Sequence, residues 1–245
     1  MPSDQTNTFR EIEVEWHKAE RESDKRAVWR TLARGGWFRA CRDAVQRNDR
    51  TTLETWLDAD DTTKQDIVQF NGIEAAQMVR THILCGLAVC RAREVALREP
   101  IDTLPEVVSV KVPLGFRRDL MQALLAEPLR KAERNLSLAV LLVDTARNEG
   151  AGATLTLELM LNGGGEFYPI PELAFMRDKD FHQAEDNARA CVEGAGLWQK
   201  DWDVRWRLQR RDGKPLVTLS GPSMGAAFAL GLAKLFADHL PNLPS

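Results

Sequence analysis

The chain has 245 residues, of which 44% are hydrophobic and 28% charged, and its formal net charge is -3. This composition is typical of a folded protein with a sizeable core. The balance of acids and bases gives no electrostatic argument for nucleic acid or an anionic membrane as partner, and we predict neither. No run of 18 apolar residues occurs, and the polar start lacks the pattern of a signal peptide, so we expect a cytoplasmic protein.

The cysteines and histidines are scattered singly and do not have the spacing of a zinc site. They are Cys41, Cys85, Cys90 and Cys191, together with His17, His82, His182 and His239. We expect the cysteines to be reduced and mostly buried, and we predict neither a metal nor a cofactor.

The first hundred residues have helical periodicity. Helices are predicted over residues 9–32, 37–46, 49–61, 62–70 and 73–99. Prolines then begin to punctuate the chain, so we predict a helical bundle over residues 1–103 and a second domain over residues 104–245.

The second part mixes strands with helices, which makes the expected fold class α+β. Strands are predicted over residues 107–112, 154–161, 167–170, 203–209 and 215–219. Helices are predicted over residues 116–145, with a break near Pro128, and over residues 180–194, with an aspartate as N-cap.

The spacing of the apolar residues predicts which side chains of these elements point inward and which point outward. In the helix over residues 180–194, the inward positions are Ala184, Ala188, Cys191 and Val192. In the strand over residues 203–209, Arg205, Arg207 and Gln209 alternate with apolar residues and should form a basic outer face.

Three consecutive glycines, Gly163 to Gly165, lie between two predicted strands. A phosphate-binding loop opens a helix and carries a lysine followed by serine or threonine, and this segment does neither. We therefore interpret it as a tight turn.

The segment 217–232 has a strand, a glycine-bounded turn that presents Ser223, and a helix of small and apolar residues that we expect to be packed on all sides. The free N–H groups at such a helix start can stabilise an oxyanion. Ser223 is therefore the candidate nucleophile, and Gly221, Met224 and Gly225 are the candidate turn and oxyanion residues.

The turn matches the G-x-S-x-G pattern of an α/β-hydrolase, but the required acid and histidine are not available. Only Asp238 and His239 follow Ser223, next to each other toward the end of the same predicted helix and about 23 Å away along it. This disfavours a hydrolase of that class.

The residues Gly221-Pro222-Ser223-Met224-Gly225-Ala226-Ala227 resemble the serine segment of the Lon (S16) protease domain, which has the ribosomal-protein-S5 domain-2-like fold. The resemblance extends over about residues 150–240, in the order of the predicted elements. It implies a nucleophile at Ser223 and a lysine base on a later element. The only later lysine in this sequence is Lys234, about 16 Å along the same helix.

Two functions remain open. The first is a non-catalytic protein-interaction or regulatory module on a Lon-like scaffold, similar to degenerate Lon-like segments in bacterial conflict and defence proteins. The second is the N-terminal part of a Ser-Lys peptidase, with Ser223 as nucleophile and its lysine beyond residue 245. We favour the first, and note that Gly221 and Gly225 can also have a purely structural role in a tight turn.

A protein partner is further suggested by the seven tryptophans of the chain. Most can be core residues, but Trp198 and Trp202 flank Lys200 and Asp201 in a predicted loop. We predict that Trp198 and Trp202 are exposed anchors for a protein partner.

Overall fold

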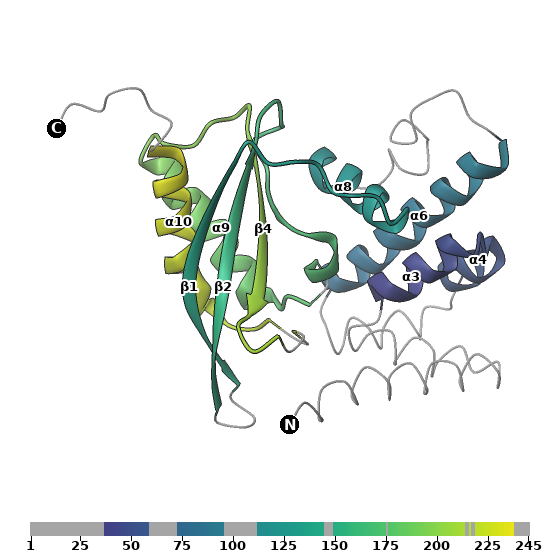
Figure 1. Cartoon of the computed structure of the whole chain (residues 1–245), viewed down its shortest axis with the longest axis horizontal. Coiled ribbons are helices and arrows are strands. Elements are labelled where there is room, and N and C mark those ends of the chain that lie inside the picture. Colours follow the sequence, from purple (N-terminus) through teal and green to yellow (C-terminus); the bar gives the residue numbers. More distant parts are fainter. Residues whose placement is uncertain are drawn as a thin grey trace. The chain divides into compact units, whose positions relative to one another are not determined.

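The computed structural model describes residues 37–58, 73–95, 112–144, 149–174, 176–213, 216 and 219–237 (Figure 1). Within these residues the fold is mixed α+β, with six α-helices and a four-stranded mixed sheet. The chain forms two compact units that divide between Leu129 and Arg130, and the short segment Pro171–Met176 belongs to the first. The predicted boundary after residue 103 lies outside the described residues. None of the described helices is long and apolar enough to cross a bilayer.

The first unit is built from four described helices. They are α3 (Trp37–Gln46), α4 (Arg50–Leu57), α6 (Ile73–Val95) and α8 (Leu114–Leu124). The predictions of helices over 37–46 and 73–99 are confirmed in their described parts, and the helix predicted over 49–61 ends at Leu57. The helices predicted over 9–32 and 62–70 lie outside the described residues, as does the strand predicted over 107–112 except for its last residue.

The core of the first unit contains a buried histidine. His82 on α6 is held by a hydrogen bond of 2.7 Å between its Nδ1 and the carbonyl oxygen of Met78. Its ring makes edge contacts with Phe38 of α3 and Phe116 of α8. Burial lowers the pKa of His82 to about 4, so the imidazole is neutral in the folded protein.

The second unit contains the sheet, whose strand order is β1-β2-β4-β3. The strands are β1 (Arg134–Asp144), β2 (Glu149–Met160), β3 (Phe167–Pro169) and β4 (Asp203–Arg210). β2 pairs antiparallel with β1 and β4, whereas β3 pairs parallel with β4. The strands predicted over 154–161, 167–170 and 203–209 are thus confirmed.

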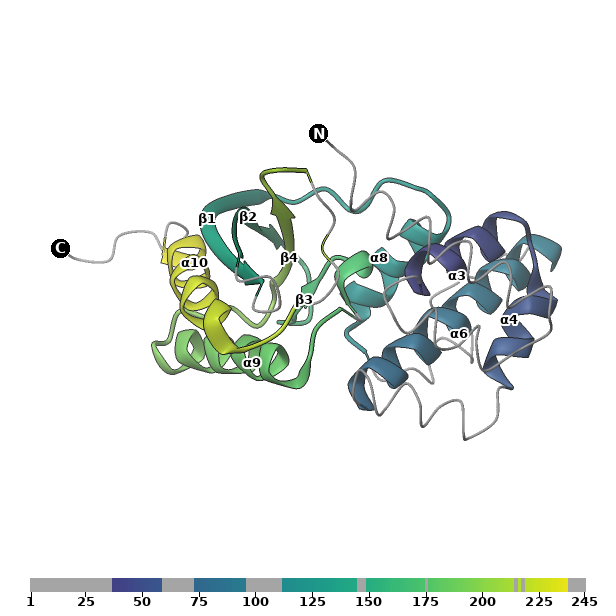
Figure 2. The ribbon, with the colours of Figure 1, turned by 90° about the horizontal axis from the view of Figure 1, so that it is seen from below.

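Two helices, α9 (Lys179–Gly194) and α10 (Gly225–Ala237), cover one face of this sheet (Figure 2). The inward face of β4 carries Trp206, whose ring contacts Phe181 of α9 and Phe228 of α10. Gly231 brings α10 close to the sheet, because an added Cβ would lie 2.6 Å from Leu157 and 2.8 Å from Leu138. An apolar core therefore fixes the start of both helices.

The prediction of a helix over residues 116–145 is wrong beyond α8. Residues 134–144 form strand β1. From Leu136 to Val143, even-numbered residues are half-buried and odd-numbered residues are exposed, which is the period of a strand. The segment is almost continuously apolar, so its sequence does not show this alternation.

Three expectations about side chains also need correction. Arg205 does not lie on a basic outer face, because it is buried and its Nε donates to Glu158 at 2.6 Å. Cys191 is exposed and not inward. The outer side of α10 is open, since 71% of Leu230 is exposed. All four cysteines are free thiols, of which three are buried as expected.

Candidate functional site

The serine turn leads into a helix as predicted, whereas the predicted strand over 215–219 is described only at residues 216 and 219, of which Leu219 forms a single bridge with Arg177. Gly221 has a φ of 82°, a left-handed conformation that favours glycine, and a single 3₁₀ turn, Pro222–Met224, leads into α10. The side chain of Met224 is buried and fixes the turn in the core, whereas Ser223 is exposed. The turn therefore presents the serine hydroxyl to solvent.

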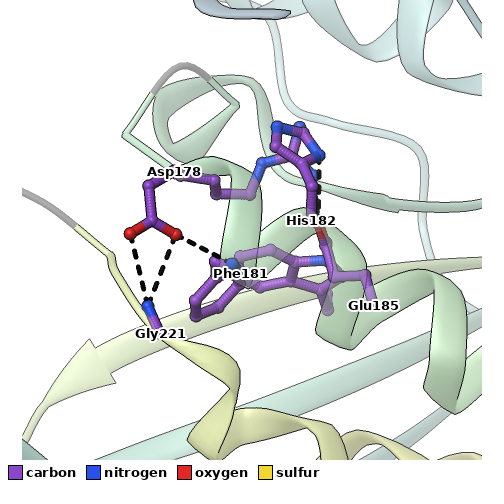
Figure 3. A network of polar contacts seen from close by, with 7 residues as sticks. Asp178, Phe181, His182, Glu185 and Gly221 are labelled. Carbon is purple, nitrogen blue, oxygen red and sulfur yellow. Dashed lines mark hydrogen bonds and ion pairs between the residues drawn. The ribbon is translucent and has the colours of Figure 1, made fainter. Parts of the chain in front are cut away.

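The start of α9 is tied to this turn by Asp178 (Figure 3). Its Oδ1 accepts the N–H of Phe181 at 2.8 Å, which makes Asp178 the N-cap of α9. The same carboxylate accepts the N–H of Gly221 at 3.3 and 3.4 Å, and the N–H of Asp178 donates to the carbonyl of Leu219. One carboxylate thus serves both the helix cap and the serine turn.

This arrangement uses two of the three predicted oxyanion donors internally. The N–H of Gly221 faces Asp178, and the N–H of Gly225 donates to the carbonyl of Pro222. An oxyanion at this turn would also meet the negative charge of Asp178. The geometry therefore differs from a preformed oxyanion hole.

Within the part of the chain that the structure describes, no base lies at the serine. Among the described residues, none forms a hydrogen bond with the hydroxyl of Ser223. Lys234 lies in the last turn of α10, exposed and about 16 Å away along the helix. Asp238 and His239 lie outside the described residues.

A buried polar network lies beside the turn, at the start of α9. Glu185 accepts from Arg177 Nη1 at 2.5 Å and from Trp206 Nε1 at 2.6 Å, and its Oε2 lies 3.5 Å from His182 Nδ1. Burial raises the pKa of Glu185, and Arg177 together with the Trp206 donor opposes that rise. Burial, helped by the Arg177 cation, lowers the pKa of His182 to about 3.

The network was not predicted from the sequence, although two signals for it were present. Glu185 follows the inward Ala184 on α9, and Trp206 lies on the inward face of its strand, where its N–H needs an acceptor. Because Arg177 and Trp206 both donate to the Glu185 carboxylate, we assign the network a structural role.

The two histidines with lowered pKa should make the protein less stable in acid. Below the usual pKa of 6.5, the unfolded chain binds more protons at His82 and His182 than the folded chain does. Stability should be fully present above pH 6.5 and fall as the pH drops toward 4. Glu185, whose pKa is raised, acts in the opposite sense, but Arg177 limits its rise.

The measurement is urea unfolding of the wild type and of His182→Gln, between about pH 7 and about pH 5. The wild type is expected to lose about 1 kcal/mol more than His182→Gln over this range, less than the full linkage value because the His182 side chain is 27% exposed. Equal losses in both proteins would contradict the assignment to His182.

The glycine turn after β2 binds a carboxylate of the protein itself. Oδ1 of Asp203 accepts the N–H of Gly164 at 2.8 Å and that of Glu166 at 3.1 Å. Asp203 is buried at the start of β4. The interpretation of this segment as a turn between strands is confirmed. Its amide groups hold the turn between β2 and β3 against the start of β4.

The prediction that Trp198 is exposed is wrong. Trp198 is buried, and its ring lies 5.1 Å from that of Phe236 at the end of α10 and 5.1 Å from the guanidinium carbon of Arg189. Trp202 is half-buried and stacks on Phe236 at 6.0 Å. The segment after α9 folds back on α10, which turns both tryptophans toward apolar side chains.

The described part of the chain therefore defines an α+β protein with an exposed serine turn next to a structural carboxylate. Comparison of the chain with protein-family models, with curated proteins and with solved structures finds no match.

Proposed function

We propose that the chain is a non-catalytic protein-interaction module of the cytoplasm, with a helical bundle followed by a partial Lon-like α+β domain. The main support is the contact of Asp178 with Gly221, because a carboxylate takes the amide group that an oxyanion would need. The absence of a base near Ser223 among the described residues also supports it. On the sequence resemblance, we further propose a regulatory role in a bacterial defence system.

Exposed apolar side chains support the interaction role. Leu141 and Val143 on β1 are 68% and 63% exposed, and Leu230 on α10 is 71% exposed. Single exposed apolar residues are common, but these belong to two elements that pack against each other. Because Trp198 is buried and cannot serve as the anchor, we assign the interaction to Leu141, Val143 and Leu230.

The second candidate is a Ser-Lys peptidase whose lysine lies on a segment beyond residue 245. The observation that favours it is the exposure of Ser223 at the start of a helix. In that case the Asp178 contact would have to open when the base is supplied.

An activated fluorophosphonate probe tests the proposal. We expect no covalent labelling of the wild-type chain, and the same result for Ser223→Ala, with an active serine protease as positive control for the probe. Labelling of the wild type that disappears in Ser223→Ala would establish a reactive serine and overturn the non-catalytic role.

A further inference from the structure

Strand β1 is an edge strand without the usual protection. It stands at one end of the sheet, and no described residue pairs with its outer side. It pairs with β2 over all eleven residues without a bulge, and its positions 135–143 contain no charge, proline or glycine. Natural edge strands generally carry one of these features, because an open edge binds other strands.

The far half of β1 is also apolar on its exposed side. Leu141 lies opposite Gly152 and Val143 lies opposite Gly150, so no side chain of β2 stands directly across from either. The pairing of β2 with β4 begins only at Ala153, so this end of the hairpin extends past the third strand. A two-stranded extension with exposed apolar residues gains stability when another surface covers it.

Helix α10 packs beside β1 (Figures 1 and 2), on the sheet face opposite Leu141 and Val143, because it contacts Leu138. The closeness of Gly231 to both Leu138 and Leu157 shows that the helix lies over the β1–β2 pair. Leu230 and Ala226 are exposed, and Lys234 is the only charged residue of the helix. A helix that is apolar all round is normally covered on all sides.

We infer that a second copy of this chain binds here, with the two β1 strands paired antiparallel about a two-fold axis. This inference rests on the proposed interaction role and names its partner. Paired strands lie about 4.8 Å apart, and α10 lies above the middle of the β1–β2 pair. Measured along the sheet, each α10 would therefore lie roughly 5 Å from the two-fold axis. The two α10 helices would then be about 10 Å apart, close to the usual 8–10 Å of packed helices.

The sequence of β1 fits this symmetry in one register. With Ala139 opposite its own copy, the nine uncharged positions pair with one another, and the arginine at position 134 falls opposite the aspartate at position 144 of the second copy. An unrelated extended peptide could pair with the same edge, but it would leave Leu230 uncovered. The two-fold arrangement pairs the open edge of β1 and brings the exposed sides of the two α10 helices together at once.

Sedimentation of the full chain over a range of concentrations tests the dimer. We expect the wild type to dimerise, and Leu141→Lys and Leu230→Glu each to weaken the dimer at least about tenfold, because the first puts a charge on the pairing edge strand and the second puts one into the helix contact. The matched control is Leu161→Lys, since Leu161 is 40% exposed but follows the opposite end of β2. It should leave the dimer unchanged.

A cysteine at the two-fold axis tests the register. In a Cys191→Ser background, Ala139→Cys should give a covalent dimer on mild oxidation, because directly opposed residues have Cβ atoms about 5 Å apart. Ser137→Cys, which would face Leu141 of the second copy, should not. A wild type that stays monomeric, or a dimer that tolerates both charged variants, overturns the inference.

These outcomes are separate from those of the probe experiment. A monomer that the probe does not label refutes the self-association alone. Labelling of Ser223 refutes the non-catalytic role, whether the protein is a monomer or a dimer.

Discussion

Replacing Glu185 with alanine is expected to lower the free energy of unfolding of the sheet-containing unit by about 3–5 kcal/mol. Glu185 is buried and accepts hydrogen bonds from Arg177 and Trp206, both of which are also buried. Alanine leaves the Arg177 cation in an apolar environment without this carboxylate, and removes the acceptor of the indole N–H. Both changes expose polar groups to a medium that cannot solvate them.

Urea unfolding followed by tryptophan fluorescence gives the measurement. The double variant Arg177→Met/Glu185→Leu should lose less stability than Glu185→Ala, because it removes both charges together. The matched surface control is Glu193→Ala on the same helix, whose exposed pair with Arg189 should be worth less than about 0.5 kcal/mol. A loss below about 1 kcal/mol for Glu185→Ala would show that water reaches the network.

Replacing Gly163 with alanine is expected to cost about 3 kcal/mol. The added Cβ would lie 2.3 Å from Cγ and 2.5 Å from the backbone nitrogen of Asp203. The backbone of β4 is held in the sheet, and the Asp203 carboxylate is held by two amide groups, so neither can move away without losing hydrogen bonds.

The neighbouring glycine is the control for that experiment. A Cβ added at Gly164 would have its nearest neighbour, Cγ of Glu166, at 3.8 Å, an ordinary contact. Gly164→Ala should therefore change the free energy of unfolding by less than about 1 kcal/mol. Similar losses in the two variants would indicate a general effect of side chains in the turn and would contradict the specific contact of Gly163 with Asp203.

Elements with a clear period could be predicted from the sequence. β2 and β4 alternate between apolar and polar residues, and α9 has its small inward residues at helical spacing. β1 could not be predicted, because an apolar run of this length fits a buried helix as well as a strand. The decision comes from its pairing with β2, which is a tertiary contact.

The candidate site was predictable only in its local part. The turn around Ser223 follows from neighbouring residues, but Asp178 contacts Gly221 across 43 positions of the chain. Nothing in the local pattern around Gly221 indicates that contact. The burial of Trp198 depends in the same way on Phe236, which is remote in sequence.

The route of the chain through the two units has a practical consequence. After β3, the segment Pro171–Met176 leaves the second unit for the first, and the chain returns at Arg177. Leu173 and Ala174 are buried there. A protein shortened to residues 130–245 would carry these residues without the helices around them, as an apolar loop between β3 and α9. The second unit therefore cannot be isolated by one cut, and autonomous folding would require replacing that loop with polar residues.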